Sequence, residues 1–307
     1  MMALLSISGH AIVLYPLTFI LLFCFSFTAY AVSVVDDTGN NVILEQPAQR
    51  IVTLAPHLTE LLFSLEAGER IIATVDYSDY PAAALSIPRI GGAEDISAEV
   101  ILALQPDLVV AWDKGSPAEV LALLESLDVV VYRASSQAII GVAKTLLDLA
   151  VLTEKTPIAT PLVEQFKDDV AKLKNRYQGK APVSVFYQLW SEPLMTANKQ
   201  QMINEMITLC GGSNLFSEQL EVVPQTNVES ILVLNPDVIL APEQGTPPDW
   251  RQRWQAWPEI TAVKGQHLYS LNADLINRPT LRSVEGLAQV CQLLDRVRAD
   301  QVRSDER

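Results

Sequence analysis

The sequence predicts an α/β protein with two Rossmann-like lobes, each built on a parallel-rich sheet, joined by a rigid interlobe helix and holding a ligand cleft between them. Three observations lead to this prediction. The segment 97–111 recurs at 227–241 with seven of fifteen positions identical. Strand-like and helix-like segments alternate along both halves, as in parallel sheets covered by helices. An amphipathic helical pattern at 161–177 lies between the halves.

Both copies of the repeat have the same internal order. A polar helix start and an apolar helical turn are followed by Pro-Asp and then by a run of apolar, mostly β-branched residues. This order is typical of a helix that leads into a buried parallel strand. The copies are 130 residues apart, whereas solenoid repeats recur every ~20–50 residues. The repeat therefore predicts two similar lobes, and the likeness of 59–62 (TELL) to 204–207 (NEMI) extends it.

The first 31 residues look like a targeting segment. They contain no Asp, Glu, Lys or Arg, their centre is apolar, and Ala29-Tyr30-Ala31 has the small-x-small form of a signal-peptidase site. The missing basic residue at the start leaves a retained membrane anchor as the alternative. Phe23 before Cys24 is too bulky for a lipoprotein signal. We interpret 1–31 as a cleaved signal peptide, which predicts export.

The composition describes a folded, acidic protein. Hydrophobic residues make up 49% of the chain and the formal net charge is −14. Nucleic-acid binding, which needs a basic surface, is disfavoured. Without the signal, Cys210 and Cys291 remain, either as a disulfide or as two separate buried thiols. With only His57 and His267 left and no CxxC motif, we expect no metal site.

The first lobe is predicted at 32–157, the bridging helix at 158–179 and the second lobe at 180–307. A β-ribbon at 32–47 opens the first lobe. Its further strands are expected at 50–55, 71–75, 108–111 and 129–132, and its helices at 58–65, 118–127 and 139–152. The bridging helix has a proline at its first position, Pro161, and Gly179 just beyond its end. The second lobe adds strands at 183–189 and 268–271, helices at 202–209 and 284–294, and a frayed tail at 298–307.

Catalytic motifs are missing from the sequence. It has no G-x-S-x-G element, and neither Gly91-Gly92 nor Gly211-Gly212 stands in a phosphate-binding frame. We therefore predict a protein that is not an enzyme, with no catalytic residue and no cofactor.

Loops predicted at the carboxyl ends of the strands are rich in aromatic residues. In parallel α/β sheets ligands bind at this edge, and large flat side chains with few polar anchors suit an apolar, planar ligand. The alternative is that these rings only cap the sheets. The loops are 77–81, 112–116, 190–193, 242–250 and 274–278.

Several of these segments together resemble a known family. They are the export signal, Arg50-Ile51-Val52, Tyr77-Ser78-Asp79-Tyr80-Pro81, Ala103-Leu104-Gln105-Pro106-Asp107, Cys210-Gly211-Gly212 and the bridging helix. The chain resembles, over essentially its whole mature length, the periplasmic substrate-binding proteins of ABC importers whose lobes are joined by a rigid helix. This class handles cobalamin, haem and ferric siderophores. The resemblance implies a monomer in the periplasm that serves an inner-membrane permease and its ATPase.

Within this family the chain is most similar to the cobalamin-binding members. The resemblance implies that Tyr77 and Trp112 contact a corrin ring and that Asp274 and Arg278 are polar contacts. It also implies that Cys210 and Cys291 form a disulfide. Glu99 and Glu229, the equivalent acids of the repeat, match the glutamates that dock onto arginines of the permease. A first-turn carboxylate is also favoured by the helix dipole, and both roles are compatible.

The chain departs from the cobalamin-binding pattern at several positions. Ala93 and Val223 replace two aromatic walls, and Leu189 and Met195 replace two phenylalanines. Trp190 is adjacent and is expected to compensate.

The departures leave haem or a siderophore as the alternative ligand. Tyr80-Pro81 is similar to the Tyr-Pro of haem-binding relatives, in which the tyrosine ligates iron. Gly91-Gly92-Ala93 stands where those relatives have Gly-Tyr.

Overall fold

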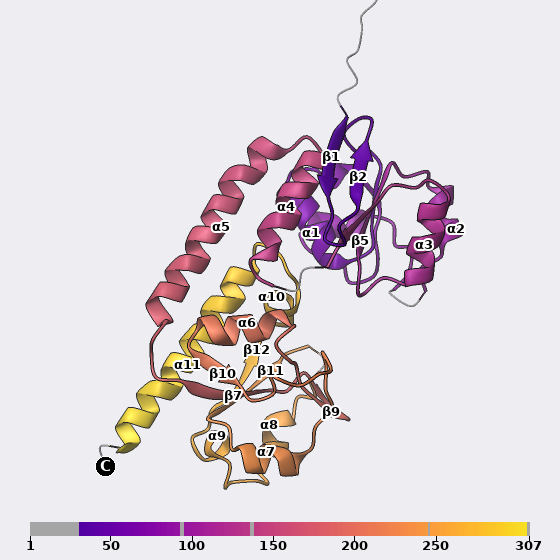
Figure 1. Cartoon of the computed structure of the whole chain (residues 1–307). Helices are drawn as coiled ribbons and strands as arrows, with labels where there is room; N and C mark the ends of the chain where they lie inside the picture. The colour runs from indigo at the N-terminus through magenta and orange to yellow at the C-terminus, as the bar shows by residue number, and fades with distance from the viewer. Residues whose placement is uncertain (1–30, 93–94, 136–137, 245, 306–307) are drawn as a thin grey trace, which may run out of the picture.

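The computed structural model describes residues 31–92, 95–135, 138–244 and 246–305. The predicted signal peptide lies outside these residues except for Ala31, and so does Ala93. Two α/β lobes are connected on one side by the long helix α5 (Thr156–Tyr177), with α11 (Ser283–Asp305) beside its lower half (Figure 1). The predicted fold class is confirmed.

The N-terminal lobe contains a four-stranded parallel sheet in the order β4-β3-β5-β6. Its strands are β3 (Ile51–Thr53), β4 (Ile71–Ala73), β5 (Leu108–Trp112) and β6 (Val131–Ala134). An antiparallel ribbon of β1 (Val32–Val35) and β2 (Asn41–Leu44) precedes it. The helices are α1 (Pro56–Ser64), α2 (Ala98–Ala103), α3 (Ala118–Ser126) and α4 (Gly141–Leu152), with short 3₁₀ turns η1 (Gly68–Arg70) and η2 (Ala82–Ser86).

The C-terminal lobe has a second parallel sheet in the order β10-β7-β11-β12. Its strands are β7 (Val183–Tyr187), β10 (Gly212–Asn214), β11 (Val238–Pro242) and β12 (Leu268–Leu271). A hairpin of β8 (Trp190–Ser191) and β9 (Leu194–Met195) follows β7. The helices are α6 (Met202–Leu209), α7 (Val228–Leu234), α8 (Trp250–Trp254), α9 (Thr261–Lys264), α10 (Ala273–Asn277) and α11.

The repeated segment occupies the same place in both lobes, as α2 and β5 in one and α7 and β11 in the other. Each sheet follows the order second, first, third, fourth strand, and the repeat supplies the third. The aspartates of the two copies also make equivalent hydrogen bonds. Asp107 accepts hydrogen bonds from the backbone N–H of Gln49 and Arg50, before β3, and Asp237 accepts from the N–H of Ser184 at the start of β7. Each aspartate thus ties the third strand of its sheet to the first.

The bridging helix begins earlier than predicted, at Thr156 instead of near 158–161. Pro157 supplies the proline of the first turn, and Pro161 lies inside the helix. A proline removes one backbone hydrogen bond, but α5 continues because its buried side chains, including Val163 and Phe166, pack into the core. At about 1.5 Å per residue its 22 residues extend about 33 Å. The same apolar core cluster contains residues of both lobes, so the lobes share packed side chains beside this helix.

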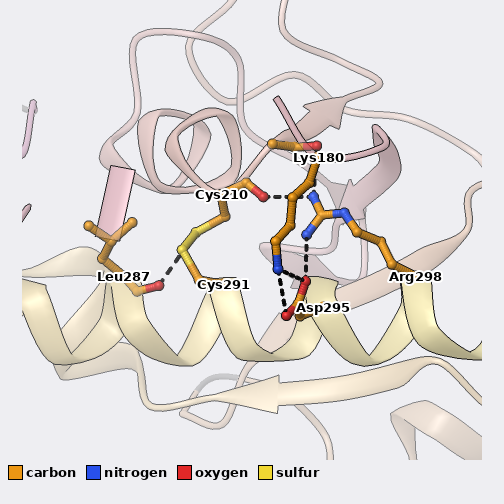
Figure 2. The surroundings of a disulfide bond; sticks show 7 residues. Lys180, Cys210, Leu287, Cys291, Asp295 and Arg298 are labelled. Atoms are coloured by element: carbon orange, nitrogen blue, oxygen red, sulfur yellow. Dashed lines mark hydrogen bonds and ion pairs between the residues drawn. A yellow bond between two sulfur atoms is a disulfide. The ribbon is translucent and has the colours of Figure 1, made fainter. Parts of the chain in front are cut away.

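The structure contains the expected disulfide but not the expected frayed tail. Cys210, just after α6, is bonded to Cys291 of α11, which confirms the pairing (Figure 2). The tail prediction is wrong, because α11 continues to Asp305. Its Arg298 is buried and donates hydrogen bonds to the carbonyls of Cys210 and Ala181, at 2.7 and 2.6 Å. These contacts hold the last turns of the helix against the C-terminal lobe.

Among the described residues, every helix is too short or too polar to cross a lipid bilayer.

Candidate functional site: the cleft between the lobes

Trp112 lies at the floor of the interlobe cleft. As the last residue of β5, it stands at the carboxyl end of a parallel strand, where ligands bind in such sheets. Its ring meets His57 edge-on at a centroid distance of 5.9 Å. Together these rings line a cavity of about 60 Å³ whose opposite wall comes from the C-terminal lobe, including Met202, Ile276 and Asn277.

His57 is an uncharged group in this cleft. It is the second residue of α1 and is buried, so its charged form would lack solvation. Burial and the positive charge of Arg278 lower the pKa of His57 from 6.5 to about 3. The floor of the cleft therefore consists of a neutral imidazole beside an indole, which is an apolar and aromatic surface at neutral pH.

Arg278 joins the two lobes at the edge of the cleft. From the end of α10 it donates to the Asp79 carboxylate at 2.8 Å and to the carbonyl of Tyr77 at 3.1 Å, both in the N-terminal lobe. It also forms an ion pair with Asp274 at 3.1 Å. Partial burial raises the pKa of Asp79, but the hydrogen bond and charge of Arg278 outweigh it, so the net pKa lies below its ordinary value. The structure thus brings Tyr77, Asp274 and Arg278 together at one edge of the cleft.

A second arginine makes a parallel connection. Arg282 donates to both carboxylate oxygens of Glu60 in α1, at 2.7 Å each, and its guanidinium lies 3.6 Å from the ring centroid of Tyr80. Glu60 is buried, whereas Tyr80 keeps 44% of its surface exposed. A cation over an aromatic face is an attractive arrangement. Tyr80 is therefore placed at the same edge of the cleft as Arg278 and Tyr77.

The loop that carries Tyr77, Asp79 and Tyr80 rests on a buried cluster of hydroxyl groups. Thr53 of β3, Thr74 after β4 and Ser78 of the loop are linked in a chain of 2.8 Å hydrogen bonds. Arg89 donates to the carbonyl of Ser78 at 2.7 Å. The backbone of Tyr77 has φ +62°, a left-handed conformation that costs energy for a residue with a side chain. These contacts anchor the loop, so its aromatic rings are held at the edge of the cleft.

The other aromatic residues of the predicted loops differ in how exposed they are. Tyr77 is 80% exposed and Trp190 47% exposed, so both present large free ring surfaces. Trp190 belongs to the β8–β9 hairpin, where its indole N–H donates to the Glu192 carbonyl at 3.1 Å. The expectation that the loop 242–250 brings its aromatic residue to the cleft is wrong for Trp250. That side chain is buried in the core of the C-terminal lobe, because it begins helix α8, which packs over the sheet.

The repeat glutamates are both exposed, one on each lobe. Glu99 lies in the first turn of α2, whose N-cap is Ser97, and Glu229 in the first turn of α7, whose N-cap is Asn227. A hydrogen bond from Ser97, aided by a backbone N–H, lowers the pKa of Glu99. An exposed carboxylate on each lobe can pair with cations of a partner. In Figure 1 helices α2 and α7 lie on different lobes, at the outer side of each.

No cluster of three or more histidine, cysteine or carboxylate side chains in the described part of the chain is arranged to hold a metal ion.

The family model for the periplasmic binding proteins matches residues 51–275, which is most of the chain. The chain belongs to the periplasmic binding protein family. Its sequence is 36% identical to the vitamin B12-binding protein of Vibrio campbellii over 253 residues, covering 82% of this chain and 91% of the relative. Relatives of this family are binding proteins.

Solved structures of periplasmic binding proteins have the same architecture. The vitamin B12 binding protein BtuF of Vibrio cholerae superposes with a TM-score of 0.77 and 33% sequence identity, over 82% of this chain and 98% of that one. The heme binding protein HutB of Vibrio cholerae has a TM-score of 0.70, covering 80% and 98%, at 22% identity. The second likeness is one of fold alone.

Four residues at the cleft or at the contacts between the lobes were not predicted as site residues: His57, Glu60, Asp79 and Arg282. Asp79 stands inside the predicted loop, and Glu60 inside the likeness of 59–62 to 204–207, so both positions carried a signal. Arg282 follows Arg278 by four residues, which is a further signal. His57 had none, because an isolated histidine in a helix is more often a core residue.

Proposed function

We propose that this periplasmic binding protein captures a corrinoid, with cobalamin as the expected ligand, and delivers it to an ABC permease in the inner membrane. One observation carries the proposal: Trp112 lies in the cleft, and Arg278, with its partners Asp79 and Asp274, lies at the edge of the same cleft. The identity to vitamin B12-binding proteins supports it. The signal peptide predicted at 1–31 would direct the chain to the periplasm.

The chemistry of the cleft suits a corrin ring. A corrin is a large, nearly flat apolar ring with amide side chains around its edge. The exposed rings of Tyr77, Tyr80 and Trp190 and the indole of Trp112 offer faces for the ring. Arg278 and Asp274 supply a donor and an acceptor for the amides. The cavity beside Trp112 measures only about 60 Å³, so a corrin also needs the exposed rings at the edge of the cleft.

Haem is the second candidate, because the Tyr80 ring is exposed at the same edge. In this arrangement the phenol oxygen would ligate the iron and Arg282, over the ring, would remain nearby.

Delivery requires docking on the permease, for which we assign Glu99 and Glu229. Both are exposed first-turn carboxylates at equivalent positions of the repeat. A pair of acids at fixed separation on a shared rigid core would match a pair of basic residues on the permease.

Titration of purified residues 32–307 with cyanocobalamin and, separately, with hemin tests the ligand. We expect a tight calorimetric isotherm with cyanocobalamin. Hemin binding alone, with a tyrosinate-type spectrum that Tyr80→Phe abolishes, would replace cobalamin by haem and keep the transport role. Binding of neither ligand would contradict the proposal.

A further inference from the structure

A second and larger cavity lies inside the C-terminal lobe. Its volume is about 170 Å³. Three tryptophans, Trp250, Trp254 and Trp257, form much of its wall, and Leu194 and Val228 complete the apolar lining. An apolar cavity of about 150 Å³ is large enough to hold a benzene molecule. This pocket therefore has room for one aromatic ring or one branched aliphatic side chain.

The pocket is separate from the ligand cleft. In the β8–β9 hairpin Trp190 pairs with Met195 and Ser191 pairs with Leu194. Directly opposed residues point to the same face of a hairpin and neighbouring residues to opposite faces. Ser191 and Leu194 line the pocket, so Trp190, the predicted ligand residue, is on the other face. One hairpin thus divides the two sites.

Three polar side chains of the pocket wall, those of Gln188, Ser191 and Trp254, already have partners. The indole N–H of Trp254 donates to the Gln188 side-chain oxygen at 2.6 Å, and the Gln188 amide donates to the Ser191 hydroxyl at 3.0 Å. Gln188 is buried. A guest would therefore find aromatic and aliphatic surface with few free hydrogen-bonding groups, which favours an apolar group.

Charged residues of both signs adjoin the pocket, and the proposed docking acid of this lobe, Glu229, follows one of its wall residues in the chain. Val228, in the wall, directly precedes Glu229 in α7. Glu192 and Asp249 adjoin the wall residues Ser191 and Trp250, and the single guanidinium of Arg253 pairs with both. Arg251, whose guanidinium lies 4.9 Å from the ring centroid of Trp250, is a second cation at this wall, so Glu192 and Asp249 are balanced by two arginines. Glu229 is exposed, so a partner that enters this pocket gains from a positive charge beside its apolar group.

We propose that this pocket, together with Glu229, forms the docking site of the C-terminal lobe for the permease, and that it receives one apolar side chain flanked by a basic residue. The inference rests on the proposed transport function and deepens it. Buried apolar anchors in pockets supply much of the affinity of protein interfaces, and exposed ion pairs supply orientation. Glu229 would then orient the partner while the tryptophan pocket holds it.

The test measures binding of the cobalamin-loaded protein to the cobalamin permease–ATPase complex from the same genome, reconstituted in lipid nanodiscs. Leu194→Trp fills the pocket with a larger side chain. Trp257→Ala acts in the opposite way, because it removes the half-buried indole that forms part of the pocket wall. Leu194→Met is the matched control because it conserves volume. We expect each of the first two variants to bind the complex at least tenfold more weakly, while both variants stay folded and cyanocobalamin affinity stays near wild type.

A double-variant cycle sharpens the test. Leu194→Trp should couple with Glu229→Arg, since both act on one contact, and should be additive with Glu99→Arg on the other lobe. Unchanged permease binding in two folded pocket variants would overturn the inference and leave the transport role intact. Micromolar binding of free indole in the pocket, without effect on docking, would make it a small-molecule site and also overturn it. If wild type binds cyanocobalamin but not the complex, the delivery function fails and this inference fails with it.

Discussion

The carboxylate of Glu60 receives two hydrogen bonds from Arg282, at 2.7 Å each, across the boundary between the lobes. The equivalent acid of the other lobe also reaches across. Glu205, in α6, accepts from the backbone N–H of Ile139 at 2.6 Å. Burial raises the pKa of Glu205, and the hydrogen bond from Ile139 partly offsets this. The internal duplication therefore places one acid on each lobe at the boundary, and each acid contacts the opposite lobe.

Removing Glu60 should destabilise the protein. Glu60 is 3% exposed, and Glu60→Ala leaves the Arg282 charge without its partner. Breaking a buried pair costs about 3–5 kcal/mol, and we expect about 3 kcal/mol because Arg282 retains some contact with water. Denaturant unfolding measures the loss. Glu221→Ala, at an exposed acid outside the helices and strands, is the control and should change stability by less than about 0.5 kcal/mol. Equal effects of the two changes would contradict this role of Glu60.

The imidazole of His57 should make stability depend on pH. The unfolded histidine gains its proton near pH 6.5, whereas the folded one stays neutral down to about pH 3. The unfolded state therefore binds more protons in this window, so stability is full above pH 6.5 and is lost as the pH falls toward 3. From pH 7 to 5 the contribution amounts to about 2 kcal/mol. His57→Gln should lack this component in unfolding measured at both pH values, and identical pH profiles would exclude it.

The disulfide should contribute substantially to stability. It links Cys210 and Cys291 across 81 residues of sequence, and a crosslink over a long loop restricts the unfolded chain. We expect the double variant Cys210→Ala/Cys291→Ala to lose about 2–5 kcal/mol. The measurement is chemical unfolding of the variant beside wild type. Reductant should lower the stability of wild type and leave the variant unchanged. An effect of reductant on the variant would show that it acts elsewhere.

Trp112 should contribute to ligand affinity through its ring. Trp112→Ala removes the indole from the floor of the cleft and should weaken cyanocobalamin binding by roughly 1–3 kcal/mol, the typical range for a stacked aromatic contact. Calorimetry measures the change, and Trp112→Phe should restore part of it. Trp257→Ala, in the pocket behind the hairpin, is the matched control and should leave this affinity unchanged. Wild-type affinity in Trp112→Ala would make the ring a cap of the sheet.

Charge reversal at the two repeat acids should separate capture from delivery. The double variant Glu99→Arg/Glu229→Arg is expected to abolish cobalamin uptake by cells while calorimetric affinity for cyanocobalamin stays at wild type. The reason is that both carboxylates are exposed and lie outside the cleft, at equivalent first turns of α2 and α7. Glu221→Arg, another exposed acid, serves as the control. Normal uptake by the double variant would remove the docking role.

Much of the fold was predictable because it follows from local patterns of apolar and polar residues. Apolar periodicity placed the strands and helices within a few residues, and the repeat revealed two lobes with equivalent third strands. Errors fell at element ends, as at Thr156, where a second proline nearby offered an equally good start. The polar end of α11 was wrongly predicted to fray, because the acceptors of Arg298 belong to residues 181 and 210–211, far away in the sequence.

The sequence by itself determined the lobes, the bridging helix and the aromatic loop 77–81, because these depend on periodicity, turn residues and an internal repeat. Only the tertiary structure decided which charges meet between the lobes. Glu60 and Arg282 are 222 residues apart in the chain, and Asp79 and Arg278 are 199 apart. It also decided that Trp112 lines the cleft while Trp250 is buried in a lobe. An ion pair or a pocket wall depends on distance in space, which local patterns do not encode.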